Sequence, residues 1–303
     1  NVEDSLQVIN KYVDRYAKYF EANKDLLPSG YSMHDPDPRV LLLPGVGSIT
    51  TGDSTKEGKM LADIAFHTHS VAAKVIDCFK EADTIGDREI FGFDYWPMEL
   101  FKLSSKPKPK KFAGSVFIVT GAGSGSGRGI ALELAENGAN LVLADLTEDG
   151  LKKTEEEILK IKGLKPQFVV GDQTKENVIL ETIQSAVKNY GGFDGAVMSA
   201  GIGVSDSLET LTLEKWNQGL AVNLTSSFLL TKHAMINLRK QGIGGSLVYI
   251  ASKNAFSPGA GFGGYSVSKA GMLQLMRIAA LEGGPVQIRA NAINPDAIFD
   301  NSK

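Results

Sequence analysis

The sequence predicts an α/β fold in which helices cover both faces of a parallel sheet. From Ser115 onward, short apolar runs of strand length alternate with longer segments that carry apolar residues at helical spacing. A glycine-rich turn follows the first of these strands, and Asp145 closes the second strand. Strands that alternate with helices of this length form a parallel sheet with helices on both faces, which is a doubly wound fold.

Composition limits the function classes. The 303 residues are 43% hydrophobic and 22% charged with a net charge of -3, which is typical of a soluble globular protein of one large or two smaller domains. The chain has no basic excess, no apolar run long enough to span a membrane and no signal peptide build at its start. We therefore expect a cytoplasmic protein that binds neither nucleic acid nor membrane.

The single cysteine and the two chain ends lead to two further expectations. Cys78 lies among apolar residues of a helical stretch, so we expect a buried structural thiol in a reducing compartment. The chain does not begin with Met and stops soon after an apparent strand and proline turn, so we expect a fragment of a longer protein.

Residues 1–103 precede the alternating region and form a separate predicted domain. The spacing of apolar residues predicts a helix over 2–20, a short buried strand over 40–43 and a further helix over 95–103. Asp53, Ser54 and Glu57 predict a capped start for a long helix over 56–82. The residues expected on its buried side are Leu61, Ile64, Ala65, Val71, Val75, Ile76 and Phe79.

His67 and His69 invite comparison with a metal site. Side chains two residues apart on a helix point to nearly opposite sides, so the two rings could not reach one ion. We therefore interpret both as ordinary helix histidines and assign no metal site.

A linker rich in lysine and proline separates this domain from the rest. Residues 104–114 begin Ser-Ser-Lys-Pro-Lys-Pro-Lys-Lys, in which the prolines suppress helix and the lysines favour solvent exposure. Residues 115–303 form the second predicted domain. Its strands are predicted over 116–119, 141–144, 167–170, 195–198, 246–251 and 289–294, and its helices over 130–136, 148–162, 175–189, 213–238 and 264–282.

The glycine turn after the first strand predicts a dinucleotide site. Gly121, Gly125 and Gly127 allow a sharp turn and close approach of a ligand, and the following helix directs free N–H groups at a pyrophosphate. Asp145 stands where a carboxylate accepts the ribose hydroxyls of an adenosine. It would repel a 2′-phosphate, and Leu146 offers no cation, so we expect NAD rather than NADP. Arg128 is expected at the helix start on the solvent side.

A second motif predicts acid–base chemistry. Tyr265 and Lys269 are four residues apart and so share one helix face, where the ammonium favours the phenolate. Such a tyrosine can exchange a proton with an alcohol or carbonyl. Ser252 follows a predicted strand, and the ends of parallel strands face the cofactor crevice. Asn223 stands in the predicted long helix over 213–238, which precedes the strand that leads to Ser252.

Together these residues resemble the short-chain dehydrogenase/reductase family, which has a Rossmann fold. The resemblance covers residues 115–303 and implies that Tyr265 is the catalytic acid/base, that Ser252 positions the substrate oxygen and that Lys269 lowers the tyrosine pKa and holds the nicotinamide ribose. It also implies that Asn223 binds a water in a proton relay. The cofactor-binding residues it implies are Gly121, Ser124, Gly125, Gly127, Asp145, Asp172, Gln173, Ala200, Gly201, Tyr265, Lys269 and Pro295, with Asp172 and Gln173 near the adenine.

Three features depart from the family pattern. Ser199 stands where the family has an asparagine that steadies the sheet. Asp296 follows Pro295 in place of glycine, and no threonine is evident after it. The segment that covers the substrate, with a seventh strand, is expected beyond Lys303.

A narrower resemblance covers the whole chain. The segment 35–47, the long helix, the linker and the residues around Ser252 and Asp296 resemble bifunctional proteins in which a class II aldolase of the rhamnulose-1-phosphate kind precedes a short-chain dehydrogenase. This implies that residues 1–103 are the end of an α/β aldolase-type region whose zinc ligands lie upstream.

The resulting functional hypothesis is an NAD-dependent oxidoreductase of carbohydrate metabolism. It would oxidise a small hydroxy or hydrated aldehyde, with lactaldehyde converted to lactate in the breakdown of rhamnose-type sugars. Two alternatives remain open: a secondary-alcohol or polyol dehydrogenase, and a catalytically silent NAD-binding sensor or scaffold. Family resemblance also implies a homo-oligomer formed through helices that include the Tyr265 helix.

Overall fold

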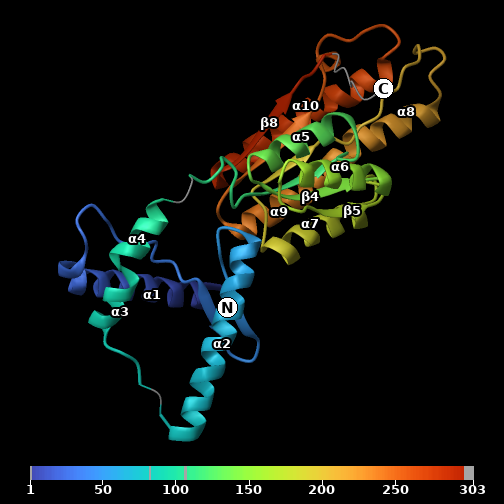
Figure 1. Cartoon of the computed structure of the whole chain (residues 1–303). Helices are drawn as coiled ribbons and strands as arrows, with labels where there is room; N and C mark the ends of the chain where they lie inside the picture. The colour runs from blue at the N-terminus through green and yellow to red at the C-terminus, as the bar shows by residue number, and fades with distance from the viewer. Residues whose placement is uncertain (1, 82, 106–107, 297–303) are drawn as a thin grey trace. The chain divides into compact units, whose positions relative to one another are not determined.

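The computed structural model describes residues 2–81, 83–105 and 108–296. They belong to two compact units, residues 1–108 and 109–303 (Figure 1).

The first unit combines helices with one β-hairpin. Its elements are α1 (Val2–Asn23), a 3₁₀ turn (Lys24–Leu26), β1 (Val40–Leu43), β2 (Gly47–Thr50), α2 (Thr55–Phe79), α3 (Asp87–Asp94) and α4 (Pro97–Ser104). The two strands are antiparallel. The capped start predicted for α2 is confirmed, because Ser54 Oγ accepts from Glu57 N at 3.1 Å and Glu57 Oε2 accepts from Asp53 N at 2.8 Å. The strand β2 and the helix α3 were not predicted.

The core of this unit is a small aromatic cluster. Phe20 of α1 packs with Phe91, Tyr95 and Leu100, and all four are buried. The rings of Phe91 and Tyr95 stack at 4.4 Å between centroids. Aromatic contacts therefore hold α1 and α3 together, and α4 adds the aliphatic side chain of Leu100 to the cluster.

The side of α2 predicted to be buried is largely exposed. Of the seven residues expected there only Ala65 is buried, whereas Ile64, Ile76 and Phe79 are 54%, 51% and 74% exposed. Cys78 is likewise exposed, so the prediction of a buried thiol is wrong. The strand over 40–43 is also only partly covered. The helix predicted from the apolar spacing is present, and among the described residues of this unit the hairpin is its main packing partner.

The second unit has a six-stranded sheet with helices between the strands. Its elements are β3 (Val116–Thr120), α5 (Gly125–Glu136), β4 (Asn140–Asp145), α6 (Glu148–Lys160), β5 (Gln167–Val170), α7 (Glu176–Tyr190), β6 (Gly195–Met198), α8 (Leu213–Leu220), a π-helical turn (Ala221–Thr225), α9 (Ser226–Gln241), β7 (Gly245–Ile250), a 3₁₀ turn (Lys253–Ala255), α10 (Gly263–Gly283), a second 3₁₀ turn (Gly284–Val286) and β8 (Ile288–Ile293).

All six strands are parallel and their order is β5-β4-β3-β6-β7-β8. The chain therefore winds outward from β3 through β4 to β5, and then from β6 through β7 to β8. The order reverses between β3 and β6, and ligands of such sheets bind at this switch point, outside the carboxyl ends of the strands. The predicted doubly wound parallel sheet is confirmed.

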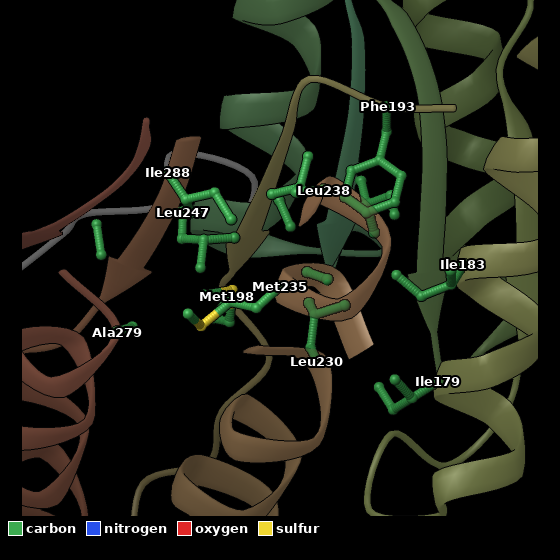
Figure 2. Packing of buried hydrophobic residues seen from close by; sticks show 14 of the residues in the cluster. Ile179, Ile183, Phe193, Met198, Leu230, Met235, Leu238, Leu247, Ala279 and Ile288 are labelled. Carbon is green, nitrogen blue, oxygen red and sulfur yellow. The ribbon is translucent and has the colours of Figure 1, made fainter. Parts of the chain in front are cut away.

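Two apolar cores fill the two faces of the sheet. On one face, residues of α7, α9 and α10 pack against β3, β6, β7 and β8. Figure 2 shows part of this core, with Ile183 of α7, Leu230 of α9, Met198 of β6 and Leu247 of β7 among the labelled side chains. On the other face, α5 and α6 cover β3 and β4. This double cover explains the continuous apolar runs of the strands.

The long helix predicted over 213–238 is interrupted. α8 and α9 are joined by a π-helical turn over Ala221–Thr225, which contains Asn223. Such turns often mark functional sites because they shift side chains out of the regular helical register.

Candidate functional site

A cleft of about 780 Å³ lies along the carboxyl ends of the strands. Its walls include residues that follow each of the six strands, as expected for a switch-point site. Of the predicted site residues, those that line it are Gly121, Ser124, Gly125, Gly127, Asp145, Asp172, Gln173, Ala200, Gly201, Ser252, Tyr265, Lys269 and Pro295. The fold therefore brings all but one of the predicted residues, Asn223, to the walls of a single cleft.

The glycine turn is packed on one side and open on the other. Gly121 has φ +67°, and a Cβ there would lie 2.8 Å from Ala200 N, in the loop after β6. A Cβ on Gly127 would overlap the carbonyl oxygen of Gly121. Gly125 also has a positive φ, +50°, but nothing lies within 4 Å of its Cβ position. Gly121 and Gly127 thus allow tight packing of the turn, and Gly125 leaves room above it.

Asp145 is oriented by the turn itself. Its Oδ2 accepts from Gly123 N at 2.9 Å, and its Oδ1 accepts from the backbone N and Oγ1 of Thr147, each at 2.9 Å. A carboxylate has further lone pairs beyond these three bonds. Asp145 is therefore held in place and keeps acceptor capacity for a ligand.

Tyr265 and Lys269 lie together on α10, as their spacing predicted. Lys269 Nζ is 5.7 Å from the centroid of the Tyr265 ring. The ammonium also donates to the carbonyl of Ile250, at the end of β7, at 2.8 Å. Ser252 is the second residue after β7, is buried and accepts from Asn254 N at 3.2 Å. The end of β7 and the first turns of α10 thus bring a phenol, an ammonium and a hydroxyl to one end of the cleft.

Burial perturbs Lys269. Its side chain is only 4% exposed, and this desolvation lowers its pKa from 10.5 to about 8. The ammonium form still predominates at neutral pH. A lysine whose pKa is displaced by burial inside a cleft is typical of a functional site.

Asn223 lies behind the cleft wall and is fully buried. Its Oδ1 accepts from Ile202 N at 2.7 Å, while its Nδ2 donates to Ile202 O at 3.0 Å and to Ser268 Oγ at 2.9 Å. Ser268 in turn donates to the carbonyl of Tyr265 at 2.7 Å. Asn223 thus ties the π-helical turn to the loop after β6 and to the backbone of the Tyr265 helix. The water relay implied for it stays a prediction.

Two residues after β5 supply acceptors. Asp172 Oδ1 accepts from Thr174 N at 2.9 Å, and this bond lowers the pKa of the carboxyl. Gln173 is buried and donates through Nε2 to Gly171 O at 3.0 Å. Its Oε1 has no hydrogen-bond partner in the part of the chain that the structure describes.

Thr120, at the end of β3, links the two halves of the sheet, a role that the sequence analysis missed. Its Oγ1 donates to Val197 O at 3.2 Å and accepts from Ser199 N at 3.2 Å and from Ala200 N at 3.3 Å. It supports the loop after β6 at the position where Ser199 replaces the asparagine of the family pattern. A polar residue closing an otherwise apolar strand is the sequence signal.

The departure at Asp296 has a structural partner. Lys253 Nζ lies 2.6 Å from Asp296 Oδ1, and Lys253 N donates to Pro295 O at 2.9 Å. Both charged residues line the cleft beside Ser252. The loops after β7 and β8 are thereby joined, and an ion pair stands at the end of the cleft that holds Tyr265.

Arg128 does not lie on the solvent side, so that prediction is wrong. Its side chain is only 21% exposed, and its guanidinium donates to Gly123 O and, at 3.1 Å, to Thr154 Oγ1. Thr154 of α6 was also missed. The signal was available, because Thr154 shares the apolar helix face of Leu151 and Ile158, where a polar residue needs a partner.

The cleft fits a nicotinamide dinucleotide. Gly125 leaves open space at the start of α5, and Ser124 makes no side-chain bond that caps this helix. The N-terminus of α5 therefore remains available to an anion. Asp145 offers an acceptor along the wall, and Gln173, which also lines the cleft, has a buried Oε1 without a partner among the described residues. By contrast, residues 2–81, 83–105 and 108–296 contain no cluster of three or more His, Cys, Asp or Glu placed to hold a metal.

Comparison with known proteins identifies the family. The sequence model described as short chain dehydrogenase matches residues 115–300. The chain belongs to the short-chain dehydrogenase/reductase family. The Rossmann fold predicted from the sequence is thereby confirmed, and the chain's relatives are dehydrogenases and oxidoreductases. Residues 2–103 match the model described as the second domain of class II aldolases, so the predicted aldolase-type region is confirmed too.

Curated oxidoreductases and dehydrogenases resemble this chain at about 30% identity. The uncharacterized oxidoreductase YuxG of Bacillus subtilis (strain 168) is 31% identical over 296 residues, which are 97% of this chain and 42% of YuxG. The chain thus spans less than half the length of that relative. Glucose 1-dehydrogenase of Gluconobacter oxydans (strain 621H) is 33% identical over 192 residues, 63% of this chain and 72% of the enzyme.

Solved structures of dehydrogenases and reductases share this fold. The NAD⁺-bound xylitol dehydrogenase is 31% identical with a TM-score of 0.60, over 62% of this chain and 72% of that structure. Levodione reductase is 30% identical with a TM-score of 0.61, over 62% of this chain and 74% of that structure. Within the described residues, no helix is long and apolar enough to cross a membrane.

Proposed function

We propose that this short-chain dehydrogenase oxidises a small hydroxylated substrate with NAD. The observation that carries the proposal is the convergence of Tyr265, Lys269 and Ser252 at one end of the cleft that also holds the glycine turn. Bound NAD supplies the hydride acceptor at this site.

The protein groups have separate tasks in this scheme. In the direction of oxidation, the deprotonated oxygen of Tyr265 accepts the proton of the substrate hydroxyl as the hydride leaves the carbon, and Ser252 Oγ orients the substrate oxygen by a hydrogen bond. Lys269 places a positive charge beside the Tyr265 ring and stabilises negative charge on its oxygen. Asp145 favours a free ribose hydroxyl over a 2′-phosphate, which supports NAD rather than NADP.

A hydroxylated substrate is favoured by the Lys253–Asp296 ion pair. Its exposed ammonium and carboxylate offer both donors and acceptors to hydroxyl groups beside Ser252. The relatives named for glucose and xylitol accord with this substrate class.

Lactaldehyde is the specific candidate within that class. The match to a class II aldolase domain on the same chain supports it, because aldolases release aldehydes. An aldehyde oxidised in hydrated form would leave as the carboxylate lactate. A polyol substrate is the second candidate.

Turnover by the full chain tests the proposal. NADH absorbance is followed with NAD and with NADP against lactaldehyde, glycolaldehyde, xylitol and a simple secondary alcohol. NADH formed from lactaldehyde supports the aldehyde candidate, and turnover of xylitol alone supports the polyol. NADH binding without turnover of any substrate would favour the silent sensor or scaffold.

Tyr265→Phe tests the catalytic assignment. Loss of the phenol should lower kcat by roughly 10² to 10⁴, the range of general acid–base catalysis, with NADH affinity nearly unchanged. Tyr190→Phe is the matched control, because the Tyr190 hydroxyl contacts Leu141 O outside the cleft. Retained turnover in Tyr265→Phe would contradict the assignment.

We further propose a cytoplasmic homo-oligomer. Exposed apolar side chains on α9 and α10, among them Phe228, Val267 and Leu281, support self-association. Light scattering that gives the mass of one chain would contradict it.

A further inference from the structure

A buried polar cluster lies behind the glycine turn. Arg128 Nε donates to Thr154 Oγ1 at 3.1 Å, and the Thr154 hydroxyl donates to Ala122 O at 2.8 Å. A second guanidinium nitrogen of Arg128 donates to Gly123 O. Thr154 is fully buried. Two side chains, one on α5 and one on α6, thus engage two successive carbonyls of the turn.

The turn is held from its other side by Asp145. Gly123 N donates to Asp145 Oδ2 at 2.9 Å. The carbonyl and the N–H of Gly123 are therefore both bound, one to Arg128 and the other to the carboxylate expected to read the adenosine ribose. Rotation of the Ala122–Gly123 peptide would break the bonds to Thr154 and Asp145 together, and rotation of the Gly123–Ser124 peptide would break the bond to Arg128.

The orientation of these carbonyls matters for an anionic ligand. A turn binds phosphate through N–H groups, whereas a carbonyl oxygen turned to the ligand would repel it. Because Ala122 O and Gly123 O are bonded to α6 and α5 side chains, neither is free to turn toward a pyrophosphate.

The chemistry of arginine suits this task. Its planar guanidinium reaches Gly123 O and Thr154 at the same time. Glu157, 3.7 Å away on α6, balances the charge. A lysine at this position has a single nitrogen on a flexible chain, so it could not bond Gly123 O and Thr154 Oγ1 in the same fixed geometry.

We propose that Arg128 and Thr154 are positioning residues for the dinucleotide. They hold the peptide planes of Ala122 and Gly123, and through Gly123 they hold Asp145, in the orientation that accepts the pyrophosphate and the adenosine ribose. This inference rests on the proposed NAD function. It assigns the pair to cofactor affinity and not to the hydride-transfer step.

The test measures the Kd of NADH and of ADP-ribose by calorimetry, together with kcat at saturating NAD. Arg128→Met should weaken both ligands about 10- to 100-fold, the range for lost hydrogen bonds to a charged group, and leave kcat near the parent value. Thr154→Val, which keeps the shape of the side chain, should weaken them by about 2- to 10-fold. Arg128→Lys should lie between Arg128→Met and the parent.

Two further comparisons separate positioning from general destabilisation. The double variant should lose less affinity than the product of the single losses, because Arg128 and Thr154 share one network. Arg277→Met, which removes an exposed arginine of α10 away from the cleft, is the control and should bind as the parent does. If Arg128→Met does not fold, the Kd values of Thr154→Val decide the test.

The outcomes distinguish this inference from the proposed function. Parent-like affinity in a folded Arg128→Met and in Thr154→Val overturns the positioning role while leaving the NAD function intact. A fall in kcat at saturation with unchanged Kd also overturns it. Failure of the parent chain to bind NADH overturns both.

Discussion

Lys269 combines a fixed position in the cleft with a pKa lowered by burial. It is buried, donates to the carbonyl that ends β7 and stands beside the Tyr265 ring. The pairing of Tyr265 with Lys269 could be predicted from sequence, because residues four apart on a helix share a face. The low pKa of Lys269 could not, because it arises from desolvation by elements distant in the chain.

The stability of a Lys269→Met variant should reveal this burial. The Lys269 pKa is about 8 in the folded chain and has an ordinary value of 10.5, so between these pH values the unfolded chain binds one proton more. The parent should therefore gain up to about 3 kcal/mol of stability relative to the variant as pH rises through this window. Urea denaturation of both proteins from pH 7 to 10.5 measures the difference. A difference that is constant over this range would contradict the burial.

At the scale of elements, α5 shows how one helix serves both fold and site. Gly127 and Gly129 are two residues apart in α5, but a Cβ on Gly127 would overlap Gly121 O, whereas nothing lies within 4 Å of a Cβ on Gly129. The motif spacing indicated the turn. The difference between these two glycines depends on how closely the turn folds back on the helix.

The two alanine variants should therefore have opposite effects. Gly129→Ala should stabilise the chain by roughly 0.5 to 1 kcal/mol, because alanine has the higher helix propensity and the site is open. Gly127→Ala should destabilise it by about 1 to 3 kcal/mol, as overpacking does, and weaken NADH binding. Thermal melting and calorimetry check both. A neutral Gly127→Ala would show that the turn can move away without cost.

The connection between α8 and α9 illustrates a limit of periodicity. Apolar spacing predicted one helix over 213–238, and the structure places a π-helical turn within it. The turn contains Asn223, whose side chain is occupied by Ile202 and Ser268. Its hydrogen bonds join segments far apart in sequence, so no local pattern could have specified them.

At the scale of the whole molecule, the chain consists of two compact units that a lysine- and proline-rich segment connects. The cleft lies entirely within residues 109–303. Lys108, Lys110 and Lys111 are exposed. The composition of the linker predicted such a boundary, and the division after Lys108 falls within the predicted linker.

Limited trypsin digestion should cut first after Lys110 or Lys111, because exposed segments between compact units are the preferred sites of nicking. Lys108 precedes proline and should resist. The larger fragment should still bind NADH, since every cleft residue lies on it. Lys110→Gln/Lys111→Gln should slow the cut, and mass spectrometry identifies it. Earlier cleavage inside α7 or α10 would contradict this organisation.

The sequence alone determined the alternation of strands and helices, the glycine turn with Asp145, and the grouping of Tyr265 with Lys269. The spacing of residues close together in the chain predicts each of these features. Tertiary structure decided that Arg128 turns inward to Gly123, that Asn223 lies behind the cleft, and that the apolar side of α2 with Cys78 is exposed within its unit. These outcomes depend on which distant surfaces meet, and local periodicity shows only that a helix has an apolar or polar face.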